Sequence, residues 1–405
     1  MNAIVFIETT KSGSSREAIK AAESLGYLTV LMTGRTNFMK QRKEFSDVSQ
    51  MIYLEEISEE VIRGEIEQLQ RQGKIIKAIL SFVDPFVSMA AKLMNETCNS
   101  AISVEALEKM EDKATTRRVL DKNTATPKYN VFKTTDNLNE YMKKSFNFPK
   151  IVKSAVSKAS KNVYLVESKF EMEKAMKRVL KNYPLQKIIL EEYLDGPQYL
   201  VEVLVCNGKI NIVAIFKQEI TKEITFIVTG YELQLNLTEE RFKKLYQAVE
   251  SILKDLKVMN AACHLEIRYV NENWKLIEIN PRISGGAMNR MIKEAYGINL
   301  VEETIKLYLG YEPDLKRKYE NHIYTHYITI GSYGYVLKIT GRNKATHLPG
   351  VREVYIKPRK GAIVTPPRSM GHRYGYVIAS GASRAEAKKN AVNAARNIKF
   401  YLDPI

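Results

Sequence analysis

A chain of 405 residues, 45% of them hydrophobic and 27% charged, has the composition of a globular protein with two or three domains. Its 62 Lys and Arg against 46 Asp and Glu give a formal charge of +16, but the basic residues lack the interleaved aromatic residues of RNA-binding segments, so we expect no nucleic acid partner. The sequence has neither an apolar run long enough to span a membrane nor a secretory leader, so we expect no membrane contact and a cytoplasmic location.

The first 95 residues predict a domain in which strands and helices alternate. Residues 3–7 (AIVFI) form an apolar run typical of a buried strand, residues 16–25 have helical periodicity, and residues 27–32 form a second apolar run. A strand, a helix and a strand in this order predict a parallel sheet, and we expect a Rossmann-like domain over residues 1–95. The connection between them has Gly13 alone, so it lacks the glycine fingerprint of a dinucleotide site.

Three further segments complete the predicted domain order. Residues 96–125 predict a helical linker, because apolar residues recur at helical spacing from 104 to 124. Residues 126–200 have the mixed pattern of a small α+β domain, and residues 201–405 predict a larger domain that is rich in strands. The expected fold class is therefore α/β and α+β multidomain. Cys98, Cys206 and Cys263 are scattered, which excludes a disulfide framework and a zinc site and favours small buried side chains.

The middle of the chain predicts paired strands. Residues 188–194 (IILEEYL) predict a buried strand that ends at an Asp-Gly-Pro turn. Residues 199–205 and 210–217 predict a hairpin around Asn207-Gly208. Residues 218–225 predict a loop, followed by an extended segment and a helix from 239 to 256.

A second hairpin carries the strongest chemical signal. Residues 264–270 (HLEIRYV) and 274–280 (WKLIEIN) both alternate, with Asn271, Glu272 and Asn273 as the predicted turn. If the turn is symmetric about Glu272, Glu266 opposes Glu278 and His264 opposes Asn280 on one face of the hairpin. Opposed carboxylates repel unless a cation lies between them. Arg268 on the same face is one source of that charge, and Mg²⁺ held by the carboxylate and amide oxygens is another.

This hairpin and the sequence after it resemble a known family. The pattern E-x-R followed by E-I-N-P-R-x-S-G-G is similar to the metal-binding end of the ATP-grasp ligases, and more narrowly of the L-amino acid ligases that join two unprotected amino acids. The resemblance implies an ATP-grasp fold with a small lid domain over 126–200 and an antiparallel-sheet core, in which 201–405 holds the metal site and a C-terminal α+β subdomain. It implies ATP, two Mg²⁺ ions and two amino acids as ligands, and it makes a homodimer plausible.

The resemblance also implies roles for individual residues. Metal ligands are Glu266, Glu278 and Asn280, and Arg282 stabilises the acyl phosphate as the catalytic residue. Nucleotide-binding residues are Lys113 of an E-D-K-x-x-x-R run, Lys153, Ser160, the hinge residues Glu191, Glu192, Tyr193 and Leu194, and then Gln198 and Gln218. Substrate-binding residues are Glu219, Glu223, His264, Arg282, Ser284, Gly285 and Gly286, and the sequence does not decide between Glu219 and Glu223 as the partner of the substrate amine.

The chain departs from the family where a glycine-rich loop covers the triphosphate. Residues 155–166 (AVSKASKNVYLV) contain no glycine and present Ser157, Ser160, Lys161 and Asn162 instead. Backbone N–H groups still allow such a loop to cradle phosphate, but with less access to positive φ. For Lys113 two interpretations remain: it binds a nucleotide phosphate, as the resemblance implies, or it is an ordinary exposed lysine on a helix.

The sequence does not decide which amino acids are the substrates. A cationic first substrate such as arginine requires an acidic wall, for which Asp84, Glu105 and Glu108 are candidates, although Asp84 also suits a loop cap. Two other functions remain: an ATP-grasp ligase acting on a different carboxylate, and a nucleotide-binding or nucleic-acid-binding module without catalysis.

The end of the chain predicts two helices, over 289–296 and 300–309, and then alternating strands over 323–380. Ser383 and Glu386 form a capping box ahead of the last predicted helix.

Overall fold

The computed structural model describes residues 1–133, 135–155, 162–222 and 226–405. Ser160 and Glu223, two predicted site residues, lie outside the described residues, as does most of the predicted phosphate loop.

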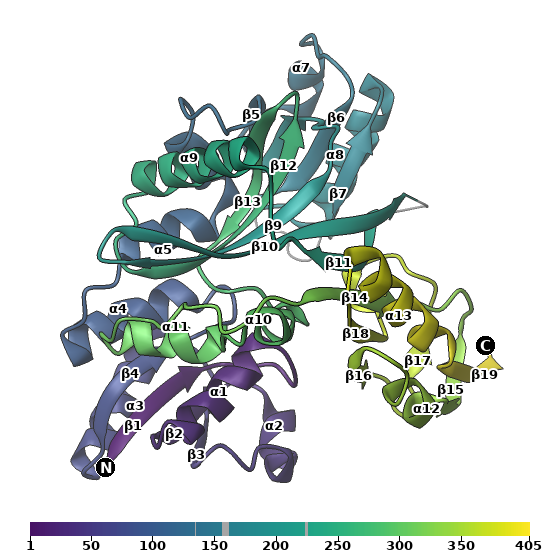
Figure 1. The fold of residues 1–405 in the computed structure, drawn as a ribbon. Helices are drawn as coiled ribbons and strands as arrows, with labels where there is room; N and C mark the ends of the chain where they lie inside the picture. The colour runs from purple at the N-terminus through teal and green to yellow at the C-terminus, as the bar shows by residue number, and fades with distance from the viewer. Residues whose placement is uncertain (134, 156–161, 223–225) are drawn as a thin grey trace.

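The N-terminal domain is built on a four-stranded parallel sheet with the order β3-β2-β1-β4. Every residue from Ala3 to Ile7 is buried, as expected for a central strand that is covered on both faces. The strands are β1 (Asn2–Ile7), β2 (Leu28–Thr33), β3 (Gln50–Tyr53) and β4 (Ile75–Leu80), and the main helices are α1 (Ser14–Ser24), α3 (Glu59–Arg71) and α4 (Val87–Cys98). The predicted parallel sheet is confirmed, and it forms the lower part of the molecule in Figure 1.

The predicted helical linker consists of two helices, α5 (Val104–Glu111) and α6 (Lys113–Val119). The break lies at Asp112, whose backbone is extended and whose carboxylate accepts a hydrogen bond from Thr115 N at 2.5 Å. Asp is unfavourable inside a helix but favourable as an N-cap, and this preference starts a new helix at Lys113.

The small domain has an antiparallel sheet with the order β5-β8-β6-β7 and a hydrophobic core of its own. Its elements are β5 (Tyr129–Phe132), α7 (Leu138–Met142), β6 (Lys150–Ser154), β7 (Val163–Val166), α8 (Lys169–Asn182) and β8 (Ile188–Glu192). A separate core allows the domain to move as a unit over its neighbour. It lies at the top of Figure 1.

The large domain is organised by an eight-stranded sheet with the order β13-β12-β9-β10-β11-β14-β18-β16. Its first strands are β9 (Gln198–Cys206), β10 (Lys209–Lys222), β11 (Phe226–Leu233), β12 (Ala261–Val270) and β13 (Asn273–Asn280), with α9 (Glu239–Asp255) beside the hairpin. The predicted loop from residue 218 is wrong up to Lys222, because β10 continues there and pairs with β11. The polar residues of this stretch hide the alternation of apolar and polar side chains that predicts a strand, and pairing with β11 stabilises the extended conformation there.

Two helices, α10 (Met288–Tyr296) and α11 (Leu300–Tyr308), follow the hairpin as predicted. The C-terminal subdomain, at the lower right of Figure 1, contributes three strands to the large sheet and forms a three-stranded sheet β17-β15-β19. Its elements are β14 (His322–Ile328), β15 (Gly334–Thr340), α12 (Arg342–Thr346), β16 (Val351–Ile356), β17 (Ile363–Val364), β18 (Gly375–Gly381), α13 (Arg384–Arg396) and β19 (Lys399–Pro404).

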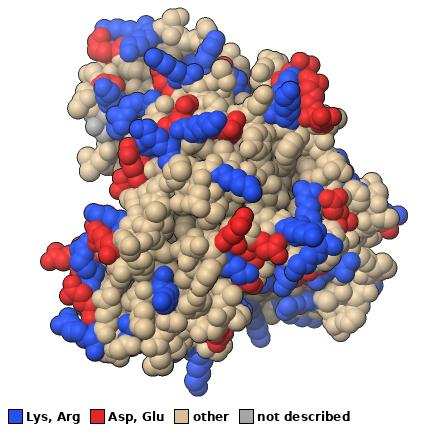
Figure 2. All heavy atoms as spheres, turned by 60° about the vertical axis from the view of Figure 1, so that its left-hand side comes forward, with Lys and Arg blue, Asp and Glu red and all other residues tan. Residues whose placement is uncertain are grey.

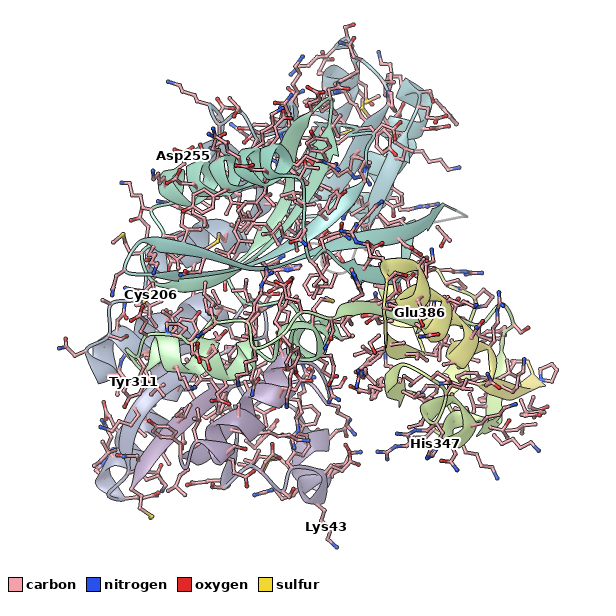
Figure 3. All side chains as sticks on the ribbon, in the orientation of Figure 1. Lys43, Cys206, Asp255, Tyr311, His347 and Glu386 are labelled. Carbon is pink, nitrogen blue, oxygen red and sulfur yellow. The ribbon has the colours of Figure 1, made fainter. Side chains whose placement is uncertain are left out.

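The predicted cap of α13 is confirmed, because Ser383 Oγ accepts a hydrogen bond from Glu386 N at 3.2 Å. Glu386 returns a bond by accepting from Ala382 N at 2.8 Å, and Figure 3 labels this residue at α13. The helix is thereby anchored against β14 and β18.

The surface has no single basic stripe on the face in Figure 2, where Lys and Arg side chains are interspersed with Asp and Glu. Among the described residues, none of the helices is both long and apolar enough to cross a membrane. Cys98, Cys206 and Cys263 are free thiols, of which Cys263 is fully buried.

Candidate active site

The register of the β12–β13 hairpin brings the predicted acidic pair together. Glu266 pairs with Glu278 and His264 pairs with Asn280, so both predicted oppositions are confirmed. The predicted three-residue turn is wrong, because Val270 pairs with Asn273 and leaves Asn271 and Glu272, at φ 47° and 61°, as a two-residue turn.

A β-bulge at Ile277 reconciles the shorter turn with the predicted register. Ile267 pairs with Leu276 while Glu266 pairs with Glu278, so Ile277 is the extra residue of β13. Without it, Glu266 would oppose Ile277 and the two carboxylates would lie on different faces. The carbonyl oxygen of Ile277 accepts hydrogen bonds from Arg117 Nη2 at 2.6 Å and Lys153 Nζ at 3.4 Å.

The acidic pair carries an electrostatic conflict that suits a cation. Burial, and next the charge of Glu278, raise the pKa of Glu266 above its ordinary value. Lys113 Nζ lies 3.4 Å from Glu278 Oε1, and Gln198 Nε2 donates to Glu266 Oε2 at 3.1 Å. Nowhere in the described ranges do three His, Cys, Asp or Glu side chains gather as a metal cage. Mg²⁺ typically takes one or two carboxylates and completes its shell with phosphate and water, so Glu266, Glu278 and Asn280 fit it.

The Glu266→Gln variant should stabilise the metal-free protein. A raised pKa means that the folded state favours neutral Glu266, so the stability of the wild type falls as the pH rises through that raised pKa. Because Gln stays neutral at every pH, the variant does not lose stability in this way. Its free energy of unfolding at neutral pH should exceed that of the wild type by up to about 1 kcal/mol, the scale of one directly opposed cross-strand pair. Thermal denaturation in EDTA between pH 4 and 8 measures the effect. Glu272→Gln, which removes the same charge from the exposed turn, should show no gain; equal gains in both variants would contradict the assigned repulsion.

A buried ion triad lies behind the bulge. Glu191 accepts from Arg117 Nε at 2.6 Å and pairs with Lys153 Nζ at 2.7 Å, and all three side chains are almost fully buried. Burial would raise the pKa of Glu191, but Arg117 and Lys153 outweigh it and lower that pKa. Burial lowers the pKa of Lys153, against the attraction of Glu191. The predicted phosphate-binding Lys153 is thus positioned by two residues, and Arg117, the last residue of the E-D-K-x-x-x-R run, was not predicted.

The predicted hinge consists of the last two residues of β8, Glu191 and Glu192, and the two residues after it, Tyr193 and Leu194. Glu192 N and Tyr193 N donate to the carbonyl oxygens of Lys128 at 2.9 Å and Pro149 at 3.3 Å, so these two N–H groups are used within the domain. The carboxylate of Glu192 accepts from Lys128 N at 2.8 Å.

Gln198 and Arg268 link the hinge to the acidic pair. Arg268 donates to the carbonyl oxygen of Leu194 and, at 3.1 Å, to Gln198 Oε1. Arg268 was one predicted source of charge between the carboxylates, yet it reaches Glu266 only through the amide of Gln198.

Glu202 is a further residue that the sequence analysis did not single out. It is fully buried, its Oε1 lies 2.6 Å from His264 Nδ1, and its Oε2 accepts from Ser284 N at 3.1 Å. Burial favours neutral His264, but Glu202 outweighs it and raises the pKa of the imidazole. One carboxylate therefore fixes both His264 and the start of the Ser284-Gly285-Gly286 turn.

That turn lies between the N-terminal domain and the C-terminal subdomain. A Cβ atom on Gly13, at φ 85°, would lie 3.1 Å from Gly286 N. A Cβ atom on Gly286, at φ 70°, would lie 3.3 Å from the hydroxyl oxygen of Tyr327. Gly13 and Gly286 thus need glycine for space and for backbone conformation, whereas a Cβ atom on Gly285, the other glycine of the motif, would meet no atom within 4 Å.

Arg282 is paired with the N-terminal domain. Its Nη2 and Nε lie 2.5 Å and 3.0 Å from Asp84 Oδ2, so Asp84 has a more specific role than a loop cap. The other two candidates for an acidic wall differ: Glu105 and Glu108 are exposed on α5, and Glu105 pairs with Lys109. Asp84 alone of the three predicted acids contacts a predicted site residue.

Gln218 and Glu219, the described candidate site residues of the predicted loop, face different neighbours. Glu219 accepts from the hydroxyl of Tyr324 at 2.6 Å and pairs with Lys388 Nζ at 2.6 Å, both in the C-terminal subdomain. Gln218 is buried and pairs across the strands with Tyr231 of β11. The carboxylate of Glu219 is therefore committed to α13 and β14.

Comparison with known proteins matches two parts of the chain to family models. Residues 146–290 match an ATP-grasp domain, and residues 326–403 match L-amino acid ligase C-terminal domain 2. The chain is 22% identical over 308 residues to dapdiamide A synthase from Enterobacter agglomerans, covering 73% of this chain and 70% of that protein.

Two further comparisons agree. The chain is 23% identical over 232 residues to an L-arginine-specific L-amino acid ligase from Bacillus subtilis, covering 55% of each chain. Its structure is similar, at a TM-score of 0.83 and 20% identity, to an L-amino acid ligase from Bacillus licheniformis, covering 100% of this chain and 99% of that one. At this identity the structural likeness establishes the fold, an α/β multidomain ATP-grasp fold with an antiparallel sheet.

Proposed function

We propose that this chain, an ATP-dependent carboxylate–amine ligase with an ATP-grasp domain and an L-amino acid ligase C-terminal domain, forms a peptide bond between two free L-amino acids. The observation that carries the proposal is the pairing of Glu266 with Glu278, beside Asn280 and within 3.4 Å of Lys113. Two acids and an amide on one face, bordered by lysines, fit a metal–triphosphate complex.

In the proposed site Glu266, Glu278 and Asn280 would hold the two Mg²⁺ ions, which would supply positive charge to the phosphate oxygens when bound. Lys113 and Lys153 bind the remaining phosphate charge, and the triad with Glu191 and Arg117 orients Lys153. Because Lys153 is already paired with Glu191, its amine keeps a fixed direction.

The reaction needs an activated carboxylate, because a carboxylate and an amine do not condense in water. A carboxylate oxygen of the first amino acid attacks the γ-phosphorus of ATP, and ADP leaves. The amine of the second amino acid then attacks the acyl carbon of the aminoacyl phosphate, and phosphate leaves with the former carboxylate oxygen. Arg282, held by Asp84, stabilises the oxyanion; loss of one such donor typically costs about 3–4 kcal/mol of transition-state stabilisation.

The domain arrangement supports a closing lid. An acyl phosphate hydrolyses when water enters, so the site must close during the reaction. The small domain over residues 126–200 has its own hydrophobic core and carries Lys153, which suits it to bring phosphate-binding groups down onto the hairpin. The N-terminal domain, Rossmann-like in its parallel strands, forms the opposite wall through Asp84 and Gly13.

The first substrate is less constrained. Asp84 is the described acid of the predicted wall that reaches the site, and its charge is shared with Arg282. A cationic amino acid, as in the name of the Bacillus subtilis relative, would need this carboxylate as a partner.

Release of ADP across the twenty amino acids, singly and in pairs, tests the proposed function. We expect turnover that requires Mg²⁺-ATP and two amino acids, with a dipeptide as product. The Glu272→Gln variant, changed only in the exposed hairpin turn, serves as a folded control and should retain this activity. ADP release that does not depend on any amino acid, or that depends on another carboxylate, would redirect the assignment to a different ATP-grasp ligase.

A further inference from the structure

Four buried polar atoms without hydrogen-bond partners gather beside the glycine turn. They are Gln218 Oε1, Ser284 Oγ, Tyr327 Oη and Arg373 Nη1, and each lacks a hydrogen-bond partner within the described ranges. Gln218, Ser284 and Tyr327 are 7%, 1% and 5% exposed. Buried polar groups in folded proteins are almost always hydrogen-bonded, so a group of unpaired ones marks a place for a polar ligand.

The four atoms belong to one continuous cluster. Gln218 of β10 pairs with Tyr231 of β11, and the rings of Tyr231 and Tyr327 lie edge to face with centroids 5.6 Å apart. The guanidinium carbon of Arg373 lies 3.9 Å from the centroid of the Tyr327 ring. Tyr327 Oη borders Gly286, which follows Ser284 by two residues. The cluster thus joins the central sheet, the glycine turn and the segment just before β18.

The charges in the cluster favour an anion. Arg373 donates from Nε to the carbonyl oxygen of Met370 at 3.2 Å, and among the described residues no Asp or Glu forms an ion pair with its guanidinium. Arg282, in contrast, already pairs with Asp84. Arg373 is partly buried and its Nη1 is fully buried, and a guanidinium in this setting is complementary to a carboxylate ligand.

We infer that this cluster binds the second, acceptor amino acid, with Arg373 and Tyr327 on its free α-carboxylate and Gln218 Oε1 on its amine. The inference rests on the proposed function. In that reaction the carboxylate of the first amino acid is consumed at the acidic pair, whereas the carboxylate of the second survives as the C-terminus of the product. A second anion site is therefore required, and Arg373 meets that requirement.

The location also suits the nucleophile. Glu266 of β12 pairs with Leu200 of β9, and Leu200 pairs with Phe216, two residues before Gln218 on β10, so the cluster lies on the strands beside the acidic pair. Gln218 Oε1 can accept one N–H of the incoming amine, which leaves the nitrogen lone pair directed at the acyl carbon. Arg373, Tyr327 and Gln218 are thus binding and positioning residues rather than acid–base catalysts.

The Arg373→Gln variant tests the inference by substrate kinetics. We expect its KM for the acceptor amino acid to rise by about 30–100-fold, the range of a lost charge-assisted interaction, with the KM values for ATP and the first amino acid unchanged. The wild type should also prefer the acceptor over its carboxamide, which lacks the negative charge, and the variant should lose that preference. Arg342→Gln, at an exposed arginine of α12, is the control and should change neither quantity.

Tyr327→Phe keeps the ring that stacks on Arg373 and removes only the hydroxyl, so it serves if Arg373→Gln does not fold. We expect its acceptor KM to rise by about 10–30-fold, the lower part of the range for one hydrogen bond to a charged group. Variants that keep the acceptor KM and the preference over the carboxamide, or that raise the KM of the first amino acid instead, overturn the inference alone. A wild type without amino-acid-dependent turnover overturns the proposed function, and this inference with it.

Discussion

The Glu278→Gln variant should lose at least about 1,000-fold in kcat while its fold stays intact, because a metal-bound phosphoryl transfer loses several kcal/mol when a ligand charge is removed. Glu278 opposes Glu266 and lies 3.4 Å from Lys113, so in the proposed site its carboxylate would lie between the metal and the lysine assigned to the phosphates. The amide of Gln keeps the shape but not the charge. Steady-state kinetics with the active amino acid pair measures the loss.

A second readout separates metal binding from turnover. Mg²⁺-ATP should raise the thermal midpoint of the wild type and of Glu272→Gln, since a ligand that binds only the folded state stabilises it. The Glu278→Gln variant should show little of this stabilisation. If the Glu278→Gln variant were fully stabilised by Mg²⁺-ATP and kept a near-normal kcat, the assignment of Glu278 as a metal ligand would be wrong.

The Glu191→Gln variant should lower the free energy of unfolding by about 3–5 kcal/mol, the usual effect of leaving buried charges without their partner. Arg117 and Lys153 are both almost fully buried, and they lie 2.6 Å and 2.7 Å from the carboxylate of Glu191. The variant leaves two buried cations beside one neutral amide. Urea denaturation followed by circular dichroism measures the change, and the affinity for ATP should fall with it because Lys153 loses its direction.

An exposed pair in the same domain provides the matched control. Lys143 Nζ, just after the end of α7, lies 2.7 Å from Oε1 of Glu140 on that helix, and the side chains of Glu140 and Lys143 are 66% and 72% exposed. Glu140→Gln should change the free energy of unfolding by less than about 1 kcal/mol, as for surface ion pairs in general. Equal effects at Glu191 and Glu140 would show that the triad contributes nothing special to the fold.

Much of the architecture could be predicted from the sequence because it follows from local patterns. The apolar run over 3–7 predicted the central parallel strand, and the alternation on both sides of Glu272 predicted the hairpin. The opposition of Glu266 and Glu278 was predicted correctly from an incorrect turn. Asn271 and Glu272 form a shorter turn, and the bulge at Ile277 restores the register; nothing in an alternating sequence distinguishes the bulged residue.

Side chains brought together over long separations could not be predicted in this way. Arg117 contacts Glu191 over 74 residues, Glu202 contacts His264 over 62, and Arg282 contacts Asp84 over 198. One signal was available: Glu202 is an acid in an otherwise apolar strand, YLVEVLVC, and a charge buried in that setting needs a partner. Arg373 gave no such signal, because its neighbours come from three separate strands and a turn.

The most direct measurement of the central claim uses the first amino acid labelled with ¹⁸O in its carboxylate. An aminoacyl phosphate route transfers one carboxylate oxygen to phosphate, so mass spectrometry should find one ¹⁸O in each phosphate released and one in the new peptide bond. Unlabelled phosphate alongside dipeptide formation, or labelled phosphate without any dipeptide, would contradict ligation of two amino acids through an acyl phosphate.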